Sequence, residues 1–106
     1  MDLGLNKKTI FISGGSSGIG KATALTYAEE QGAQIAISYY SGEAEAHQIV
    51  NEIEKKGCKA IAVYLDLADH ESIKKAVDTA INEFGTIDVL INNAVNWGKP
   101  EHREGV

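Results

Sequence analysis

The chain has 106 residues, 43% hydrophobic and 24% charged, which is enough for one small domain with a packed core and is not typical of a disordered segment. Its net charge of −5, without a cluster of cationic residues, argues against nucleic acid or an anionic membrane surface as a partner. Because it has neither a membrane-length apolar run nor a signal-peptide stretch, and its single Cys58 cannot form an internal disulfide, we expect one cytoplasmic domain over residues 1–106.

The first expected element is a strand over residues 8–13, followed at once by a glycine-rich turn and a helix. The turn is Ser13-Gly14-Gly15-Ser16-Ser17-Gly18-Ile19-Gly20-Lys21. The predicted buried face of the helix repeats every three residues and consists of Ile19, Ala22, Leu25 and Ala28. Gly32 stands where a glycine would end that helix. A strand that turns directly into a helix exposes backbone N–H groups, and therefore predicts a phosphate site.

A second strand is expected over residues 34–39, followed by a helix that Ser41 would cap and Gly57 would end. Acidic residues in the first turn, Glu43 and Glu45, favour a helix start there. The predicted buried face of this helix is Ala46, Ile49, Val50 and Ile53.

The same cycle then repeats with a strand over residues 60–65 that ends at Asp66. Asp69 is the expected N-cap of a third helix, and Gly85 would end it. The predicted buried face of this helix is Ile73, Ala76, Val77, Ala80, Ile81 and Phe84. A fourth strand over residues 87–91 stops at Asn92-Asn93, and residues 95–106 are expected to form an irregular tail.

The order β-α-β-α-β-α-β, with strands that are apolar throughout, predicts an α/β fold with a parallel sheet covered by helices on both faces. The expected strand order is 3-2-1-4, which is one half of a Rossmann-like doubly wound sheet plus the first strand of the other half. Ligands of such sheets bind outside the carboxyl ends of the strands. Three segments fall at those ends, namely Ser13-Gly14, Asp66 and Asn92-Asn93-Ala94.

The glycines of the turn have distinct expected roles in a dinucleotide site. Gly14 would allow the tight turn, Gly18 the close approach of a pyrophosphate, and Gly20 the close packing of the helix on the sheet. A nucleoside-triphosphate P-loop is the competing interpretation, because residues 15–21 match most of that motif. The position that should bind magnesium through a hydroxyl is Ala22, so we favour the dinucleotide site.

These strand-end segments together resemble the short-chain dehydrogenase/reductase family. Its first motif, T-G-x-x-x-G-x-G, is matched by residues 13–20 with serine in place of threonine. Its aspartate after the third strand is matched by Asp66, and its N-N-A-G by Asn92-Asn93-Ala94 with Val95 in place of glycine. The resemblance extends to about Gly98 and is closest to the classical bacterial type, which includes 3-oxoacyl-carrier-protein reductases and sugar-alcohol dehydrogenases.

The resemblance implies an oxidoreductase that moves hydride between NAD or NADP and an alcohol or ketone. The residues that would line the adenosine and pyrophosphate are Gly14, Ser16, Ser17, Gly18, Ile19 and Gly20. Asp66 and Leu67 would border the adenine ring, while Asn93 and Ala94 would approach the ribose. Asn92 would brace the central strands.

The choice of cofactor depends on the end of the second strand. An acidic residue there would hold a ribose 2′-OH and favour NAD, but residues 38–41 contain neither Asp nor Glu. They contain no cation either, so the sequence favours NADP only slightly, with hydroxyls of Tyr39, Tyr40 or Ser41 as contacts for the 2′-phosphate. The three histidines are far apart and predict no metal site.

Catalysis in this family requires a serine and a Tyr-x-x-x-Lys pair. The residues four places after the tyrosines of this chain are Gln31, Glu43, Ala44 and Ala68, so none of them is lysine. We therefore expect a truncated, cofactor-binding part that covers under half of a family member and does not turn over substrate alone. A non-catalytic nucleotide-binding or assembly module complemented by another chain is the alternative, and the unpaired edge of the fourth strand predicts self-association.

Overall fold

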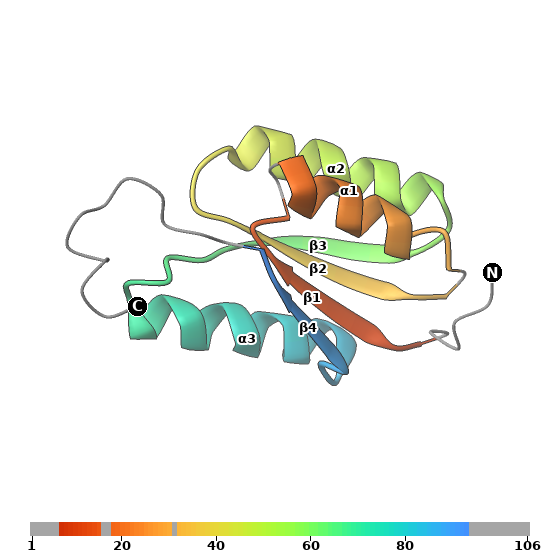
Figure 1. The fold of residues 1–106 in the computed structure, drawn as a ribbon. Helices are drawn as coiled ribbons and strands as arrows, with labels where there is room; N and C mark the ends of the chain where they lie inside the picture. The colour runs from red at the N-terminus through yellow and green to blue at the C-terminus, as the bar shows by residue number, and fades with distance from the viewer. Residues whose placement is uncertain (1–6, 16–17, 31, 94–106) are drawn as a thin grey trace.

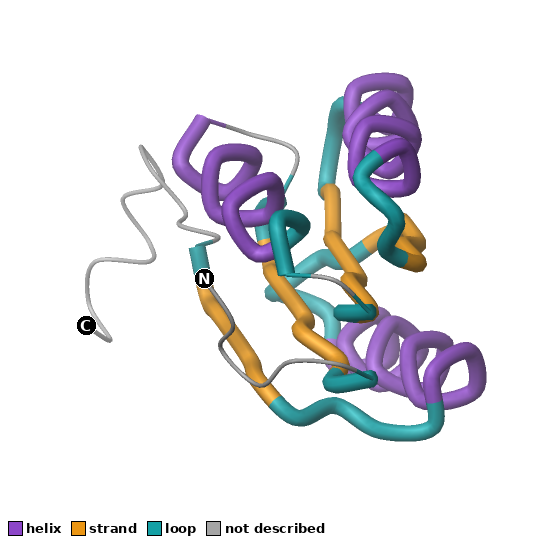
Figure 2. Tube along the Cα trace, turned by 90° about the vertical axis from the view of Figure 1, so that its right-hand side faces the viewer, coloured by secondary structure: helices purple, strands orange, loops and turns teal. Residues whose placement is uncertain are grey.

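The fold is a four-stranded parallel sheet in the order β3-β2-β1-β4, with α1 and α2 on one face and α3 on the other (Figures 1 and 2). The computed structural model describes residues 7–15, 18–30 and 32–93. Its elements in chain order are β1 (Thr9–Ser13), α1 (Gly18–Tyr27), β2 (Gln34–Tyr39), α2 (Glu43–Lys55), β3 (Lys59–Tyr64), α3 (His70–Phe84) and β4 (Val89–Asn92). The predicted fold class and strand order are thus confirmed. None of the helices in these described ranges is long and apolar enough to cross a membrane.

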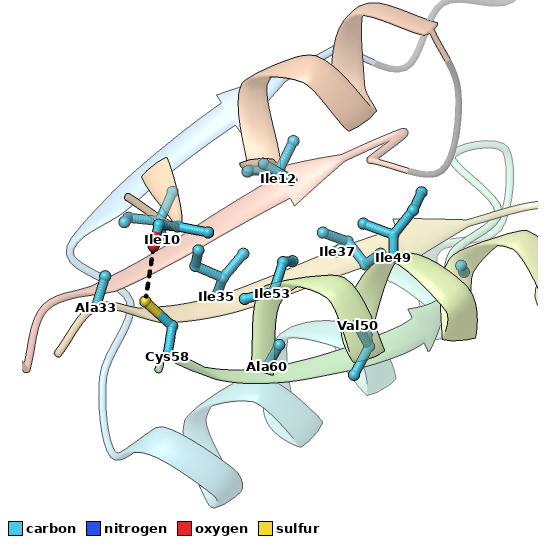
Figure 3. Packing of buried hydrophobic residues seen from close by; sticks show 13 residues of the cluster. Ile10, Ile12, Ala33, Ile35, Ile37, Ile49, Val50, Ile53, Cys58 and Ala60 are labelled. Carbon is cyan, nitrogen blue, oxygen red and sulfur yellow. Dashed lines mark hydrogen bonds between the residues drawn. The ribbon is translucent and has the colours of Figure 1, made fainter. Parts of the chain in front are cut away.

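The core has two layers because the side chains of the central strands alternate between the two faces of the sheet. One layer packs β1 and β2 against α1 and α2, and its largest members are Ile10, Ile12, Ile35, Ile37, Ile49 and Ile53 (Figure 3). The other packs the sheet against α3 and contains Phe11, Ala36, Val63, Leu65, Ala76 and Ala80. All five residues of β1 are buried, which explains why its middle residues, Ile10-Phe11-Ile12, are apolar without alternation.

The boundaries of β2 are as predicted, and those of the other three strands differ from the predicted ones by one or two residues, since pairing with the neighbouring strand sets them. At the start of β4, Asp88 makes two bonds to Thr9 instead of continuing the strand. Its Oδ2 accepts from the Thr9 N–H at 2.8 Å, and its own N–H donates to the Thr9 carbonyl at 2.9 Å. The parallel ladder therefore begins one residue later, with Val89 beside Ile10.

The buried face predicted for the first helix is only partly confirmed, because Ala28 is buried and Leu25 is partly buried against the core, but Ile19 and Ala22 do not belong to the face. Gly20 and Ala24, with Ala28 just beyond the helix end, are buried, whereas Ile19 is 77% exposed and Ala22 is exposed. The small residues repeat every four positions, and their size lets the helix lie close to the sheet.

The end predicted for the first helix is wrong. The helix ends at Tyr27, and the N–H groups of Glu29 and Glu30 bond three residues back, to Thr26 and Tyr27. These tighter turns use the last carbonyls of the helix, so Gly32 does not cap it.

The predicted caps of the other helices are mostly confirmed. Asp69 caps α3 by accepting a 3.0 Å bond from the Glu71 N–H, and Gly85 ends that helix. The N-cap of α2 is Gly42 and not Ser41. The chain enters this helix through a left-handed residue with φ 78°, which glycine adopts at little cost, so the cap falls one residue later than predicted.

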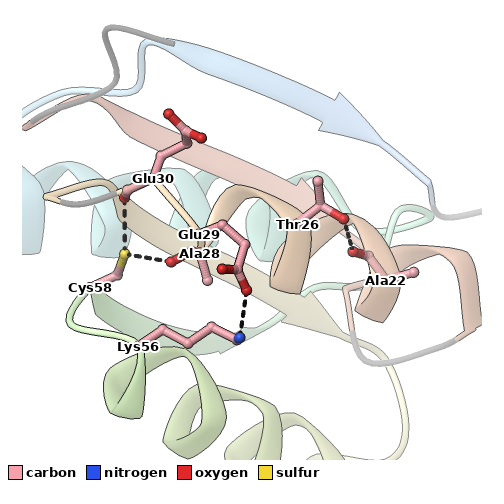
Figure 4. Close-up of polar contacts among 7 residues, drawn as sticks. All are labelled: Ala22, Thr26, Ala28, Glu29, Glu30, Lys56 and Cys58. Atoms are coloured by element: carbon pink, nitrogen blue, oxygen red, sulfur yellow. Dashed lines mark hydrogen bonds and ion pairs between the residues drawn. The ribbon is translucent and has the colours of Figure 1, made fainter. Parts of the chain in front are cut away.

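Cys58 is buried and has a structural role at the start of β3. Its Sγ lies 3.3 Å from the carbonyl oxygens of both Ala28 and Glu30, and burial raises the pKa of the thiol (Figure 4). Beside it, Lys56 and Glu29 form a solvent-exposed ion pair that lowers the pKa of Glu29 and raises that of Lys56. The start of β3 is thereby joined to the segment that follows α1.

Candidate functional site

The glycine turn leaves the sheet at Gly14, which adopts a left-handed conformation with φ 72°. Its N–H donates a 2.9 Å hydrogen bond to the hydroxyl oxygen of Ser38, near the carboxyl end of β2. An L-residue with a side chain rarely adopts such a φ, so glycine suits this position. The tight turn predicted at Gly14 is therefore confirmed.

Two further glycines let the turn and α1 come close to the sheet. A Cβ on Gly20 would lie only 2.0 Å from the Gly14 carbonyl oxygen, so the predicted close packing of the helix here is confirmed. A Cβ on Gly15 would lie 2.6 Å from the Cβ of Ile37, a contact that the sequence did not reveal. A Cβ on Gly18 would meet none of the described residues within 4 Å, so among these residues the start of α1 leaves space beside its backbone.

The helix that follows supplies backbone donors. The first N–H groups of an α-helix have no carbonyl partner within the helix, and in α1 these include the N–H groups of Gly18 and Ile19. The helix dipole adds partial positive charge at the same end. Ile19 is largely exposed there, whereas Ser16 and Ser17 lie outside the described residues.

β1 and β4 are joined at their carboxyl ends by side chains. The Ser13 hydroxyl donates to Asn92 Oδ1 at 2.8 Å, and the Asn93 N–H donates to the Ser13 carbonyl at 3.1 Å. Asn92 thus braces the central strands, as the resemblance implied.

Asn93 carries an unused donor at this edge. Its side-chain Nδ2 is buried and has no hydrogen-bond partner among the described residues. Leaving a buried amide nitrogen unsatisfied is unfavourable, so such an atom at a ligand-binding edge is suited to a ligand oxygen. Ala94 lies outside the described residues.

At the end of β3, Asp66 shapes a turn. Its Oδ1 accepts from the Ala68 N–H at 3.0 Å, and its own N–H donates to the hydroxyl of Ser72 at 2.8 Å. Leu67, at the tip of this turn, is 46% exposed. The arrangement presents an apolar side chain outward beside a carboxylate, which is compatible with the edge of an adenine ring.

Aromatic side chains gather at the ends of β2 and β3. The ring of Tyr40 stacks on that of Tyr64 with centroids 6.1 Å apart, and Tyr39 meets Tyr64 edge to face at the same distance. Partial burial, followed by the nearby Glu43 carboxylate, raises the pKa of the Tyr39 phenol, and burial likewise raises that of Tyr64. The hydroxyls of these two tyrosines are therefore neutral donors at neutral pH.

The structure thus brings the glycine turn, Ser38, the Asp66 turn and Asn93 to one edge of the sheet, as predicted for the strand ends. Sequence reasoning missed Ser38 and Gly15. A serine directly after the apolar run Ile35-Ala36-Ile37, near the end of the strand, was the available signal for Ser38. In the described part of the chain, no group of three or more His, Cys, Asp or Glu residues could hold a metal ion.

Comparisons with known proteins agree with this geometry. The 3-oxoacyl-(acyl-carrier-protein) reductase FabG of Staphylococcus aureus is 37% identical over 87 residues, which cover 82% of this chain and 35% of the reductase. The chain therefore spans about a third of the length of the curated relatives it matches.

Solved structures give the same result. A dehydrogenase/reductase from Sinorhizobium meliloti superposes with a TM-score of 0.83 at 40% identity, over 88% of this chain and 36% of that one. An NADH-dependent reductase in complex with NAD superposes with a TM-score of 0.79 at 28% identity, over 88% of this chain and 38% of that one. The family model described as short chain dehydrogenase matches residues 8–104. The chain belongs to the short-chain dehydrogenase family, whose members are oxidoreductases.

Proposed function

We propose that this chain binds a nicotinamide dinucleotide at the carboxyl edge of its sheet. The observation that carries the proposal is the glycine turn bonded to Ser38 at the same edge as Asn93, whose buried Nδ2 has no partner among the described residues. Membership of the family and the likeness to a reductase in complex with NAD support it.

Each part of the edge has a role in this proposal. The pyrophosphate lies against the first turn of α1, where N–H groups without an intrahelical partner and the helix dipole attract negative charge. Gly18 leaves room for it, and Gly14, Ser16, Ser17, Ile19 and Gly20 complete its surroundings. Asp66 and Leu67 border the adenine, and Asn93 donates to a ribose oxygen beside Ala94.

The bound cofactor would supply or accept hydride in a reaction of an alcohol or ketone substrate. That reaction also needs a proton donor and acceptor, and none of the tyrosines in the 106 residues is followed by the lysine that lowers its pKa in this family. We therefore assign binding and orientation of the cofactor to these residues, and catalysis only to a full-length form.

A calorimetric titration with NADH and NADPH tests this function. Saturable binding at one site per chain is expected for at least one of them. The lack of an acidic side chain at residues 38–41 slightly favours NADPH. A folded sample that binds neither would refute the proposal.

A second role, in assembly, is favoured by the outer edge of β4. Among the described residues this strand pairs only with β1, and its Leu90 side chain is 69% exposed. An open strand edge with an exposed apolar side chain invites pairing with another chain. Self-association, or complementation by a chain that carries the catalytic residues, would cover this edge.

A further inference from the structure

Ser38 connects the second strand to the glycine turn. Its side chain is 2% exposed, and its hydroxyl oxygen accepts the 2.9 Å hydrogen bond from the Gly14 N–H. The ladder between β1 and β2 ends with Ile12 beside Ile37, so Gly14 lies just beyond it. The Ser38 hydroxyl therefore accepts a hydrogen bond from an N–H that lies beyond the ladder between β1 and β2.

This hydrogen bond is directional, whereas the packing contacts at Gly15 and Gly20 are not. Gly15 rests on Ile37, and the Gly14 carbonyl oxygen lies against Gly20. Van der Waals contacts of this kind limit approach, but they do not orient a peptide plane as a hydrogen bond does. Because Gly20 belongs to the first turn of α1, the orientation of the Gly14 peptide affects where that end of the helix lies.

We propose that Ser38 is a positioning residue for the pyrophosphate of the dinucleotide. It does not touch the cofactor. It holds the Gly14 peptide so that the free N–H groups of the first turn of α1 face the pyrophosphate. The proposal rests on the proposed cofactor binding, and it adds a residue from the second strand that none of the three sequence motifs contains.

Three substitutions of Ser38 distinguish the effect of its hydroxyl from the effect of its side-chain shape. Ser38→Ala removes the acceptor. Ser38→Thr retains it, while Ser38→Val has nearly the same shape as threonine without it. Thr9→Val is a control for general destabilisation, because it removes the acceptor of a 3.0 Å bond from Gln34 Nε2 at the opposite end of the sheet.

Two ligands provide the readout, ADP-ribose with the pyrophosphate and adenosine without it, each titrated by NMR under conditions where every variant is folded. We expect Ser38→Ala and Ser38→Val to weaken ADP-ribose binding about tenfold and adenosine binding by less than about twofold. Ser38→Thr should bind ADP-ribose within about threefold of the unmodified chain, and Thr9→Val should bind both ligands unchanged. Hydrogen exchange of the Gly14 amide should be slow in the threonine variant and fast in the valine variant.

Equal weakening of both ligands, or equal ADP-ribose affinity of Ser38→Val and Ser38→Thr, would overturn the positioning role while leaving cofactor binding intact. If the folded, unmodified chain binds none of ADP-ribose, NADH and NADPH, the proposed function fails, and the role of Ser38 fails with it.

Discussion

The hydroxyl of Ser13 donates a 2.8 Å hydrogen bond to Asn92 Oδ1 and thereby joins β1 to β4 at the carboxyl edge of the sheet. The same pair stands in register in the parallel ladder. Just beyond it, the Asn93 N–H donates to the Ser13 carbonyl. β1 and β4, whose carboxyl ends lie at the proposed cofactor site, are therefore held together there by main-chain and side-chain hydrogen bonds.

Removal of the Ser13 hydroxyl should destabilise the fold. Ser13→Ala leaves Asn92 without this donor, although the exposed amide can still reach water, so we expect a loss of about 1 kcal/mol in the free energy of unfolding. Ser13→Thr keeps the hydroxyl and is the control. Urea denaturation of the three proteins measures the difference, and equal midpoints for Ser13→Ala and the unmodified chain would contradict the role of this bond.

Alanine substitutions at Gly18 and Gly20 should have opposite consequences. Gly20→Ala places a Cβ 2.0 Å from the Gly14 carbonyl oxygen, so α1 must move and stability should fall by about 2 kcal/mol or more. The methyl group of Gly18→Ala meets no atom of the described residues within 4 Å, so this substitution should leave stability equal or slightly higher. It should weaken NADH binding, because its methyl group occupies the space next to the free N–H groups.

Thermal denaturation and NADH titration of this pair check both statements. A Gly20→Ala variant as stable as the unmodified chain would contradict the close packing of α1. A Gly18→Ala variant with undiminished affinity would show that the cofactor does not approach this residue.

The order of the elements and the strand order were predictable because short apolar runs alternate along the chain with segments of helical spacing, and glycines mark the turns between them. The face of α1 was not predictable from the three-residue repeat of Ile19 and Ala22, because Gly20 and Ala24 leave almost no hydrophobic signal. The helix turns its small residues towards the sheet because they allow close approach, and not because they are hydrophobic.

The candidate site shows the same limit. The glycines, Asp66 and the two asparagines were found from motifs and strand ends, which the parallel topology brings to one edge. Ser38 was not found, since its contact with Gly14 joins residues 24 positions apart and depends on the register between β1 and β2. The spacing of residues along the chain gives no information about that register.

Cys58 should make stability depend on pH in the alkaline range. Burial raises the pKa of the thiol above its ordinary value of 9.0, so the folded state favours the protonated form. This contribution is fully present below the pKa of the unfolded chain and is lost as pH rises towards the higher pKa of the folded state. Between about pH 8 and pH 10, unfolding midpoints of the unmodified chain should therefore fall more steeply than those of Cys58→Ala. Parallel curves for the two proteins would contradict the burial argument.

Self-association through the β4 edge should be sensitive to charge at Leu90. A lysine there places a charge beside the open strand edge and should disfavour pairing with another chain. We expect Leu90→Lys to shift the chain towards monomer in sedimentation velocity experiments. Glu54→Lys, on the exposed side of α2, is a control that adds positive charge elsewhere. If both variants associate as the unmodified chain does, the β4 edge is not the interface.

The most direct test of the central claim is an NMR titration of the isotopically labelled chain with NADH and NADPH. The account predicts saturable shift changes for the backbone amides of Gly18 and Ile19 and for the side-chain amide of Asn93, whose Nδ2 has no partner among the described residues. It also predicts no change at the opposite end of the sheet, around Gln34 and Lys59. A folded chain whose spectrum stays unchanged with either dinucleotide, or changes only at that opposite end, would contradict it.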